Sequence, residues 1–490
     1  MEMNDKGSNG MVINGKVQFL IETKKVPNAP EWLFQTAKRF GFSKSDCKYI
    51  LPNNPDYKVH HLCHAWAAYA QSGFNDASIL VIDGMDRPNG RAIGIYSAKN
   101  DKIEEVRVYP FAYSLGTWYA FGVSLCGWGE KDYAGRLMGL SSYADNIGNP
   151  DPFFLVDNRT GDIIENSGIF YTVSEKSESG NFLANFSNEK YLESLIAPNE
   201  SHTDTFSFRY ANLAGKIQYI FEQAVFSLLD YMHNVLPSRN LIITGGCGLN
   251  CVCNGKIIRS GKWDNLFIPN MCEDSGNIIG RMAMEYNQNS HKPYIYNKVT
   301  YPVPKNYNRI ISKEEIAEKL KNGTVIAWFE GGSEYGPRAL CHRSLLADPT
   351  LKKTAYRLNE IKHREYWRPL APVVLDSAFK TFFDVPGKIW APHKTMLSTE
   401  YIRQEYQRKL PAVCAPDNSS RPQVLIDNPY NHTLYSLMKE NNLPILVNTS
   451  MNDNGMPICE TPQVARNFCE KYPDVLLVFV KNDTIYTRDK

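Results

Sequence analysis

Two histidines and two aspartates from distant parts of the chain have the residue types of a metal site. His60 and His64 lie four positions apart, so on a helix both imidazoles face the same side. Asp83 ends the apolar segment SILVID, and Asp274 stands in NMCEDSGNIIG just before a helical pattern. Imidazole nitrogens and carboxylate oxygens can together hold a divalent cation. Each piece also has a plainer interpretation, as the start of a buried helix, an Asp-Gly turn or a helix cap.

A glycine pair follows a second apolar segment, NLIITGG, which ends at Gly246. Because Gly245 and Gly246 have no side chains, backbone amides here can approach a phosphate or a nucleoside closely. The side-chain amide of Asn250, four residues further on, can hydrogen-bond a substrate or a ribose. A purely structural turn is an equally good interpretation of the pair by itself.

Basic residues cluster between residues 330 and 369, and a later apolar segment, PILVNTS, ends in polar residues. Guanidinium groups offer paired donors that match phosphate oxygens, and an ammonium adds a point charge. The basic residues lie among Gly, Pro, Trp and Leu, which favours an enclosed anion pocket over a solvated helix face. The residues predicted for this pocket are Arg338, Arg343, Asn359, Lys362, Arg364, Arg368, Asn448, Thr449, Ser450 and Asn452.

The elements that must position these residues alternate along the chain. Apolar segments at 78–83, 240–246, 324–329 and 444–450 predict buried strands. Residues 213–231 have apolar side chains three and four positions apart, which predicts a long helix. Strands that alternate with helices predict an α/β protein, in which ligands bind where strands end.

Length and composition predict two domains and a soluble chain. The 490 residues exceed one ordinary domain, and the polar, proline-containing segment 291–308 predicts a linker between domains at 1–290 and 309–490. The net charge of +2 gives no general indication of nucleic-acid binding. The chain lacks the run of roughly 18 apolar residues that a membrane helix needs, and its eleven cysteines have no paired spacing. We therefore expect a cytoplasmic protein without a membrane span.

Seven segments resemble, in order, the NodU/CmcH carbamoyltransferase family, whose members carbamoylate aminoglycosides, cephems and nodulation factors. The order is shared over most of the chain, from about residue 60 to residue 465. The segments are HHLCHA, VIDG, GEKDYAGRLMGLSSYA, TGGCGLNCVCNGK, EYGPRALCHRS, LNEIKHREYWRPLAP and NTSMND.

The resemblance implies an actin-like ATPase fold (ASKHA type) for the N-terminal domain and a YrdC-like α/β fold for the C-terminal domain. It implies an O-carbamoyltransferase in which the C-terminal pocket cleaves carbamoyl phosphate and passes carbamate to the other domain. There the carbamate reacts with ATP to give carbamoyl-adenylate, which an acceptor hydroxyl attacks. The resemblance is compatible with a homodimer.

The resemblance also assigns ligand-binding residues. A divalent metal, with Fe(II) expected and Mn or Mg as alternatives, would be held by His60, His64, Asp83 and Asp274. The residues that would contact ATP or carbamoyl-adenylate are Gly84, Gly135, Arg136, Gly139, Gly245, Gly246 and Asn250.

The chain departs from the family pattern at three places. Family members usually begin with an apolar strand that leads to a His-Asp-x-Ser motif, whereas this chain begins MEMNDKGSNGMVINGK and lacks both. Cys341 and His342 stand where the family prefers Gly and Asn. Arg136 replaces a usual lysine and keeps the positive charge.

The acceptor hydroxyl is open at this stage. Natural-product hydroxyls are the commonest acceptors in the family, and some phage relatives carbamoylate 5-hydroxymethylcytosine in DNA. Lys, Asn, Ile and Tyr, which have AT-rich codons, are abundant, and this residue usage fits the phage relatives. Lys352, Lys353 and Arg357 would add a phosphate-facing patch. Two other functions compete: a tRNA modification of the threonylcarbamoyl type, and a non-catalytic nucleotide-binding relative.

Overall fold

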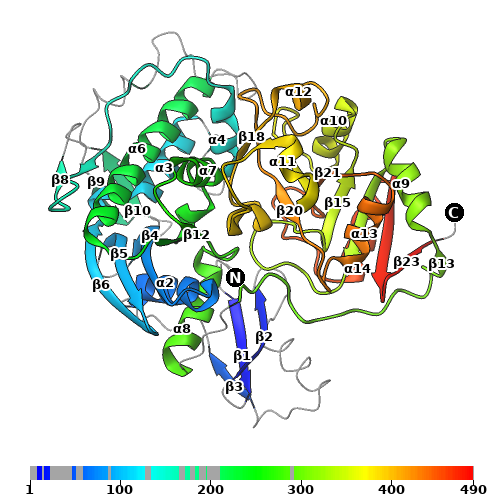
Figure 1. Ribbon diagram of the computed structural model, residues 1–490, viewed down its shortest axis with the longest axis horizontal. Helices are drawn as coiled ribbons and strands as arrows, with labels where there is room; N and C mark the ends of the chain where they lie inside the picture. Colours follow the sequence, from blue (N-terminus) through cyan, green and yellow to red (C-terminus); the bar gives the residue numbers. More distant parts are fainter. Residues whose placement is uncertain are drawn as a thin grey trace.

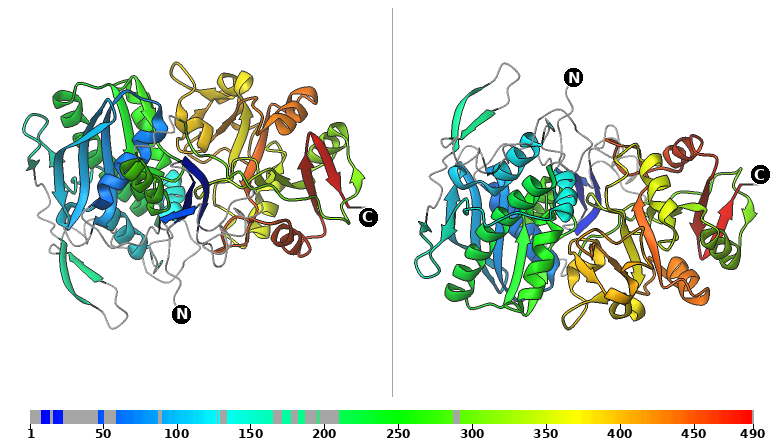
Figure 2. Two further views of the ribbon diagram at one scale, coloured as in Figure 1. Left: turned by 90° about the horizontal axis from the view of Figure 1, so that it is seen from below. Right: turned by 90° about the horizontal axis from the view of Figure 1, so that it is seen from above.

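Two large β-sheets flanked by helices organise the computed structural model, which describes residues 8–13, 16–22, 47–50, 59–86, 90–126, 128, 134–164, 171–176, 182–186, 195, 210–286 and 292–488. In Figure 1 the sheet from residues 76–267 lies on the left, in blue and green, and the sheet from residues 309–487 lies on the right. The turned views in Figure 2 keep the two sheets side by side. The predicted α/β class is confirmed as a mixed α/β fold.

The first sheet has five strands in the order β12–β11–β4–β5–β6. Strand β4 runs antiparallel to β5 and parallel to β11, so the sheet is mixed. Antiparallel neighbours need only short turns, whereas the parallel connection to β11 includes a helix, α6. The strands are β4 (Asp76–Asp86), β5 (Arg91–Lys99), β6 (Lys102–Pro110), β11 (Asn240–Thr244) and β12 (Asn265–Phe267).

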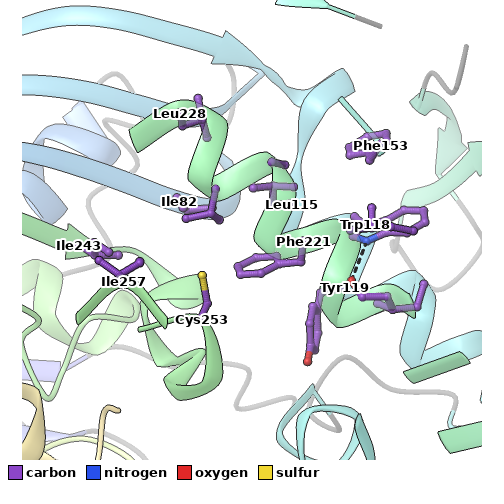
Figure 3. Close-up of a cluster of buried hydrophobic side chains, with 14 of the residues drawn as sticks. Ile82, Leu115, Trp118, Tyr119, Phe153, Phe221, Leu228, Ile243, Cys253 and Ile257 are labelled. Carbon is purple, nitrogen blue, oxygen red and sulfur yellow. Dashed lines mark hydrogen bonds between the residues drawn. The ribbon is translucent and has the colours of Figure 1, made fainter. Parts of the chain in front are cut away.

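Apolar residues of β4 alternate between the two faces of this sheet, as the two-residue period of a strand requires. Leu80 and Ile82 belong to the core that contains Trp118 of α3 and residues of α6, which Figure 3 shows in close-up. Ile79 and Val81 belong to a separate core against α2. The helices around the sheet are α2 (His60–Ser72), α3 (Leu115–Leu125), α4 (Ala134–Leu140), α6 (Ala211–Val235), α7 (Cys251–Ser260) and α8 (Asn277–Tyr286).

The second sheet has eight strands in the order β13–β23–β22–β14–β15–β21–β16–β20. Strand β14 is parallel to β22 and antiparallel to β15, and β16 is parallel to β20, so this sheet is also mixed. The strands are β13 (Arg309–Ile310), β14 (Val325–Glu330), β15 (Arg343–Ala347), β16 (Ala371–Leu375), β20 (Gln423–Leu425), β21 (Ile445–Ser450), β22 (Val475–Lys481) and β23 (Thr484–Thr487).

Strand β14 is buried along its whole length and contributes side chains to two hydrophobic cores. Ile326 and Trp328 pack with residues of α9 and α13, whereas Ala327 and Phe329 pack with residues of α10 and α14 on the opposite face. The helices are α9 (Lys313–Lys321), α10 (Lys352–Ile361), α11 (Phe379–Phe382), α12 (Gln404–Gln407), α13 (His432–Glu440) and α14 (Pro462–Cys469).

Smaller sheets complete the described structure. The prediction that the start of the chain lacks a strand is wrong, because Ser8–Ile13 forms strand β1, which pairs with β2 and β3. The remaining strands are β2 (Lys16–Glu22), β3 (Cys47–Ile50), β7 (Leu155–Val156), β8 (Ile163–Ile164), β9 (Tyr171–Lys176), β10 (Phe182–Phe186), β17 (Phe383–Asp384), β18 (Glu400–Ile402) and β19 (Ser419–Ser420).

The segment predicted as a linker packs against the second sheet in its described part. Asn297 is buried and donates to the hydroxyl of Ser333 at 2.8 Å and to the carboxylate of Glu460 at 3.2 Å. Tyr301 donates to the same carboxylate at 3.0 Å. Residues 292–308 are therefore anchored by buried hydrogen bonds although they form no helix or strand.

The four predicted buried strands are confirmed as β4, β11, β14 and β21, and the predicted helix is part of α6. Their continuous apolar character was a sufficient signal, because each strand is covered on both faces. Within the described segments we find no helix whose length and apolar character would let it cross a bilayer.

Glu330, at the end of β14, makes stability depend on pH. Burial raises the pKa of its carboxyl from 4.5 to about 7, although the indole N–H of Trp328 donates to it at 2.8 Å. The folded protein therefore holds this proton more tightly than the unfolded chain, and the resulting stabilisation, present below pH 4.5, is lost as the pH rises through about 7. At about 1.4 kcal/mol per pKa unit, the loss is on the order of 3 kcal/mol.

The substitution Glu330→Gln keeps an acceptor for Trp328 and removes the ionisation. We expect the variant to be more stable than the wild type at pH 8 and nearly equal at pH 5, measured as urea unfolding midpoints. Glu318→Gln, on the exposed side of α9, should follow the wild type at both pH values. Equal midpoints for wild type and Glu330→Gln at pH 8 would contradict the assignment.

Candidate metal centre and anion pocket

The two histidines and two aspartates predicted to bind a metal converge in space. One ligand atom from each of the four side chains lies within 4.8 Å of the other three. Asp83 Oδ2 is 3.0 Å from His60 Nε2 and 3.4 Å from His64 Nε2. Asp274 Oδ1 is 3.5 Å and 3.4 Å from the same two nitrogens. The cluster therefore offers two imidazole nitrogens and two carboxylate oxygens to a single centre.

Three elements bring the cluster together. Helix α2 carries both histidines one turn apart, and β4, on which α2 packs, delivers Asp83. Asp274 starts the short 3-10 helix η9 (Asp274–Gly276), which leads into α8. Helix α8 approaches α2 very closely at Gly280. A Cβ atom at this position would lie only 1.9 Å from the carbonyl oxygen of Cys63. Glycine at this position thus lets α8 bring Asp274 to the histidines.

Charge is concentrated in this cluster. Burial of His64 disfavours its protonation, but hydrogen bonds to Asp274 and Asp83 outweigh burial and raise its pKa to about 9. Burial also opposes ionisation of Asp83, yet the two histidines hold the pKa of this carboxyl well below its usual range. Two carboxylates are thus held among nitrogen ligands, and a divalent cation can replace the protons there. This donor set fits Fe(II), Mn or Zn.

His61, the neighbouring histidine, is not part of the cluster. Its side chain is buried, and burial lowers its pKa to about 3. Neither ring nitrogen has a hydrogen-bond partner among the residues that the structure describes. His61 is therefore a neutral imidazole on another face of α2, as the helical spacing predicts.

The glycine turn after β11 lies against Asp83. Gly245 has φ 86°, and a Cβ there would lie 2.2 Å from the carbonyl oxygen of Ile82, so only glycine fits. The amide of Gly246 donates to Asp83 Oδ1 at 3.4 Å. Gly84 adjoins the same carboxylate in sequence, and its carbonyl accepts from the hydroxyl of Ser114 at 2.6 Å. An apposed glycine turn and carboxylate form a suitable edge for a phosphate-bearing ligand and its cation.

The side chain of Asn250, predicted to contact ATP, is hydrogen-bonded to other protein groups. Its side-chain oxygen caps α7 by accepting from the backbone amide of Cys253 at 3.0 Å. Its amide nitrogen donates to Gln218 at 3.0 Å, and Gln218 donates back at the same distance. Both ends of this buried amide are engaged by protein groups, which gives Asn250 a structural role at the start of α7.

The residues predicted on α4 lie near the C-terminal part of the chain. Arg136 forms an ion pair with Glu365 at 2.9 Å and lies 5.1 Å from the ring centre of Trp128. Gly139 faces Pro369, and a Cβ there would come within 3.3 Å of the proline ring. Gly135, in the first turn of α4, has open space around it. Helix α4 therefore packs against the segment that carries part of the basic cluster.

Three arginines line a small cavity of about 80 Å³ at the edge of the second sheet. Burial and the charge of Arg421 lower the pKa of Arg338 to about 9, and burial with Arg368 and Arg421 does the same for Arg364. Guanidinium groups that destabilise one another in this way attract an anion placed between them. The full lining is Pro337, Arg338, Ala339, Arg364, Pro369, Leu370, Ala371, Met396, Arg421, Asn448, Thr449 and Ser450.

Sequence reasoning missed Arg421, because it is a lone basic residue just before β20, far from the basic cluster in the sequence. The one available signal in the sequence was the dipeptide Arg421-Pro422, which stands at the start of an apolar segment. The order of the sheet brings it to the cavity, since β20 lies beside β16 and near β21.

Arg343 does not belong to this cavity, contrary to the prediction. Its side chain is fully buried and lies 3.5 Å from the ring centre of Phe329. The guanidinium donates to the carbonyl oxygens of Glu330 at 2.6 Å and of Gly331 at 2.9 Å. Backbone carbonyls thus use its donors, so Arg343 stabilises the strand ends and is not available to a phosphate.

Four other predicted pocket residues lie outside the cavity lining. Asn359 accepts from Arg364 Nε at 2.7 Å and therefore holds a pocket arginine in place. The ammonium of Lys362 donates to Ser450 and Asn452 side chains at 3.0 Å and 2.6 Å, which fixes the loop after β21. Arg368 lies 3.9 Å from Glu365, the partner of Arg136. Asn359, Lys362, Arg368 and Asn452 thus support the pocket from outside.

The segment before the arginine pocket contacts the loop before Asp274. Gly336 has φ 80°, and a Cβ there would lie 2.1 Å from the carbonyl oxygen of Asn270. Asn270 in turn donates to the carbonyl of Tyr335 at 2.8 Å. The segment that enters the arginine pocket therefore packs directly on the loop that carries Asp274.

This mixed α/β protein thus offers one cluster of side chains suited to a divalent cation and one pocket suited to an anion. The family model described as Carbamoyltransferase N-terminus matches residues 17–283, and the one described as Carbamoyltransferase C-terminus matches residues 317–486. The chain belongs to the NodU/CmcH carbamoyltransferase family, which confirms the resemblance in its motifs.

Similar proteins extend over different shares of the chain. Nodulation protein NolNO of Sinorhizobium fredii is 28% identical over 84% of this chain, which spans 61% of the length of that protein. Nodulation protein U of Rhizobium fredii is 33% identical over 51% of this chain and 46% of its own length. The 3'-hydroxymethylcephem-O-carbamoyltransferase of Amycolatopsis lactamdurans is 35% identical over 44% of this chain and 43% of its own length.

Among solved structures, full-length HypF in the phosphate- and nucleotide-bound form is 16% identical over 34% of this chain and 22% of that chain, with a TM-score of 0.25.

Proposed function

We propose that this chain is an O-carbamoyltransferase that uses carbamoyl phosphate and ATP to carbamoylate a hydroxyl group. The observation that carries the proposal is the arginine pocket, whose adjoining segment at Gly336 packs on the loop that leads to Asp274 of the His/Asp cluster. The chain's similarity to the 3'-hydroxymethylcephem-O-carbamoyltransferase of Amycolatopsis lactamdurans supports a hydroxyl acceptor.

The arginine pocket would bind carbamoyl phosphate. Its phosphate would lie among Arg338, Arg364 and Arg421, and the polar end of β21, from Asn448 to Ser450, would hold the carbamoyl amide. Hydrolysis there releases phosphate and carbamate. Carbamate is short-lived in water, so we propose that it passes directly to the second site, whose Asp274 loop packs on the segment beside the pocket.

The second step would occur beside the glycine turn. Carbamate displaces pyrophosphate from ATP to give carbamoyl-adenylate, and the acceptor oxygen then attacks the carbamoyl carbon and releases AMP. The acceptor gives up its proton in this attack. The backbone amides of the turn would approach the nucleotide phosphates, and Asp83 would lie next to them.

His60, His64, Asp83 and Asp274 would hold the divalent metal, for which Fe(II) is our first candidate and Mn or Mg the alternatives. When bound, the metal supplies positive charge that neutralises phosphate and polarises the carbamoyl oxygen. We propose the actin-like ASKHA fold for residues 1–290 and the YrdC-like fold for 309–490. Ligand groups at the carboxyl ends of β4 and β11 support the first of these.

For the acceptor we propose a small-molecule hydroxyl. The alternative acceptor is hydroxymethylated DNA, whose phosphates would contact a patch formed by Lys352, Lys353 and Arg357. Arg357 is already paired, with two contacts to Asp474 at 2.6 Å and 2.8 Å and one to Glu360 at 2.8 Å. This pairing weakens the patch and leaves the two exposed lysines.

The test is a product assay with purified protein, carbamoyl phosphate, ATP and Fe(II). We expect phosphate release from carbamoyl phosphate, and AMP formation that depends on an added hydroxyl acceptor. Acceptor panels should contain aminoglycoside, cephem and oligosaccharide hydroxyls and, in a separate arm, hydroxymethylcytosine nucleotide and single-stranded DNA. No AMP and no phosphate under any condition would favour the non-catalytic alternative, and a carbamoylated tRNA product would favour the tRNA-modification alternative.

A further inference from the structure

Asn277 begins helix α8, and its side chain lies against both histidines of the metal cluster. Its Nδ2 atom is 3.3 Å from His60 Nδ1 and 3.3 Å from His64 Nε2. Its Oδ1 atom is buried and has no hydrogen-bond partner among the described residues. An amide that contacts two predicted ligands with one end and leaves the other end unpartnered calls for an explanation.

The contact with His60 is made on the side of the ring away from the carboxylates. His60 Nε2 faces Asp83 Oδ2 at 3.0 Å, so with Nε2–H donating to Asp83 the Nδ1 lone pair accepts from the Asn277 amide. Toward His60 the amide NH₂ group thus suits a protein without a cation, in which His60 Nε2 carries the proton, whereas the protonated Nε2 of His64 would be better met by the amide oxygen.

A cation bound at His60 Nε2 changes the hydrogen-bond partner that His60 Nδ1 needs from a donor to an acceptor. The metal takes the Nε2 lone pair, the proton moves to Nδ1, and Nδ1–H then needs an acceptor. An amide NH₂ group in that position would oppose the Nδ1 proton and the added positive charge. Rotation of the amide by 180° places Oδ1 there, because the two ends of an asparagine amide are nearly equal in shape.

We propose that Asn277 is a positioning residue of the metal centre, whose side-chain oxygen accepts a hydrogen bond from His60 Nδ1–H when a divalent metal is bound. The inference rests on the proposed function only through its metal site. Partners of this kind set the tautomer and orientation of a ligand histidine, and their loss typically costs about 10–100-fold in metal affinity. Asn277 adds no ligand atom in this scheme.

The experiment titrates the metal-free full-length protein with Co(II) and follows both heat and visible absorption. We expect Asn277→Leu and Asn277→Ala to bind Co(II) about 10–100-fold more weakly than the wild type, with absorption bands at unchanged positions. Asn277→Asp keeps an acceptor and should recover most of the affinity. Arg281→Ala, on the same helix with its partner Glu285, should match the wild type.

Each other outcome overturns the inference in its own way. Wild-type affinity in both Asn277→Leu and Asn277→Ala means that the amide has no positioning role. Shifted absorption bands in these variants, like those expected for Asp274→Ala, mean that Asn277 is itself a ligand. Absence of Co(II) binding by the wild type removes the metal centre of the proposed function together with this inference, whereas loss confined to the variants bears on Asn277 alone. Thermal unfolding of the metal-free proteins shows whether each variant is folded.

Discussion

Asp83→Asn is expected to abolish metal binding and carbamoyl transfer while leaving the fold intact. Asp83 is the central carboxylate of the cluster, since one of its oxygens faces both histidines and the other accepts from Gly246. Asparagine keeps the size of the side chain and removes its charge. Loss of an outer partner of a metal ligand already costs about 10–100-fold in affinity, so loss of a ligand charge should cost more than about 100-fold.

The measurement is metal content by mass spectrometry and product formation by the AMP assay, with circular dichroism to compare the folds. Asp76→Asn provides a matched control, because Asp76 lies on the same strand at the end away from the cluster. Full metal content in Asp83→Asn, or undiminished turnover, would show that the cation is held elsewhere.

Arg421→Ala is expected to raise the KM for carbamoyl phosphate by about 10–100-fold, which corresponds to one charge-assisted hydrogen bond of about 1.5–3 kcal/mol. Arg421 lines the cavity with Arg338 and Arg364, and its charge lowers the pKa of both. Its removal relieves repulsion in the empty pocket and takes away attraction for a bound phosphate. The variant should therefore gain stability without anion and lose the stabilisation that anion binding gives.

Two measurements test this prediction: the KM from initial rates, and the unfolding temperature with and without inorganic phosphate. Phosphate should raise the unfolding temperature of the wild type and have little effect on Arg421→Ala. Arg403→Ala is a suitable control, because this exposed arginine donates to the carbonyl of Lys380 away from the pocket. An unchanged KM together with an unchanged phosphate response would exclude Arg421 from the anion site.

The convergence of the His/Asp cluster follows largely from local patterns in the sequence. Helical spacing places His60 and His64 on one face, and Asp83 follows the apolar part of β4. Strand ends gather at one edge of an α/β sheet, so the carboxylate and the glycine pair meet there. The close passage of α8 past α2 depends on Gly280, a contact that no local pattern predicts.

The arginine pocket was predictable as a region and not residue by residue. The sequence showed many side chains with hydrogen-bond donors between residues 330 and 369. It did not show which of these side chains donate to backbone carbonyl oxygens. Carbonyl oxygens take the guanidinium of Arg343, and the polar loop after β21 takes the ammonium of Lys362. A buried donor must be satisfied, so the nearest acceptors decide its role.

The amino-acid sequence alone determined the mixed α/β class, the family and the four side chains of the His/Asp cluster, because these depend on short-range periodicity and on motif order. Only the tertiary structure decided that Asn250 caps a helix, that Arg343 serves the backbone and that Arg421 joins the pocket. The physical reason is that hydrogen-bond partners and neighbouring charges are set by strand order and by close packing between distant segments.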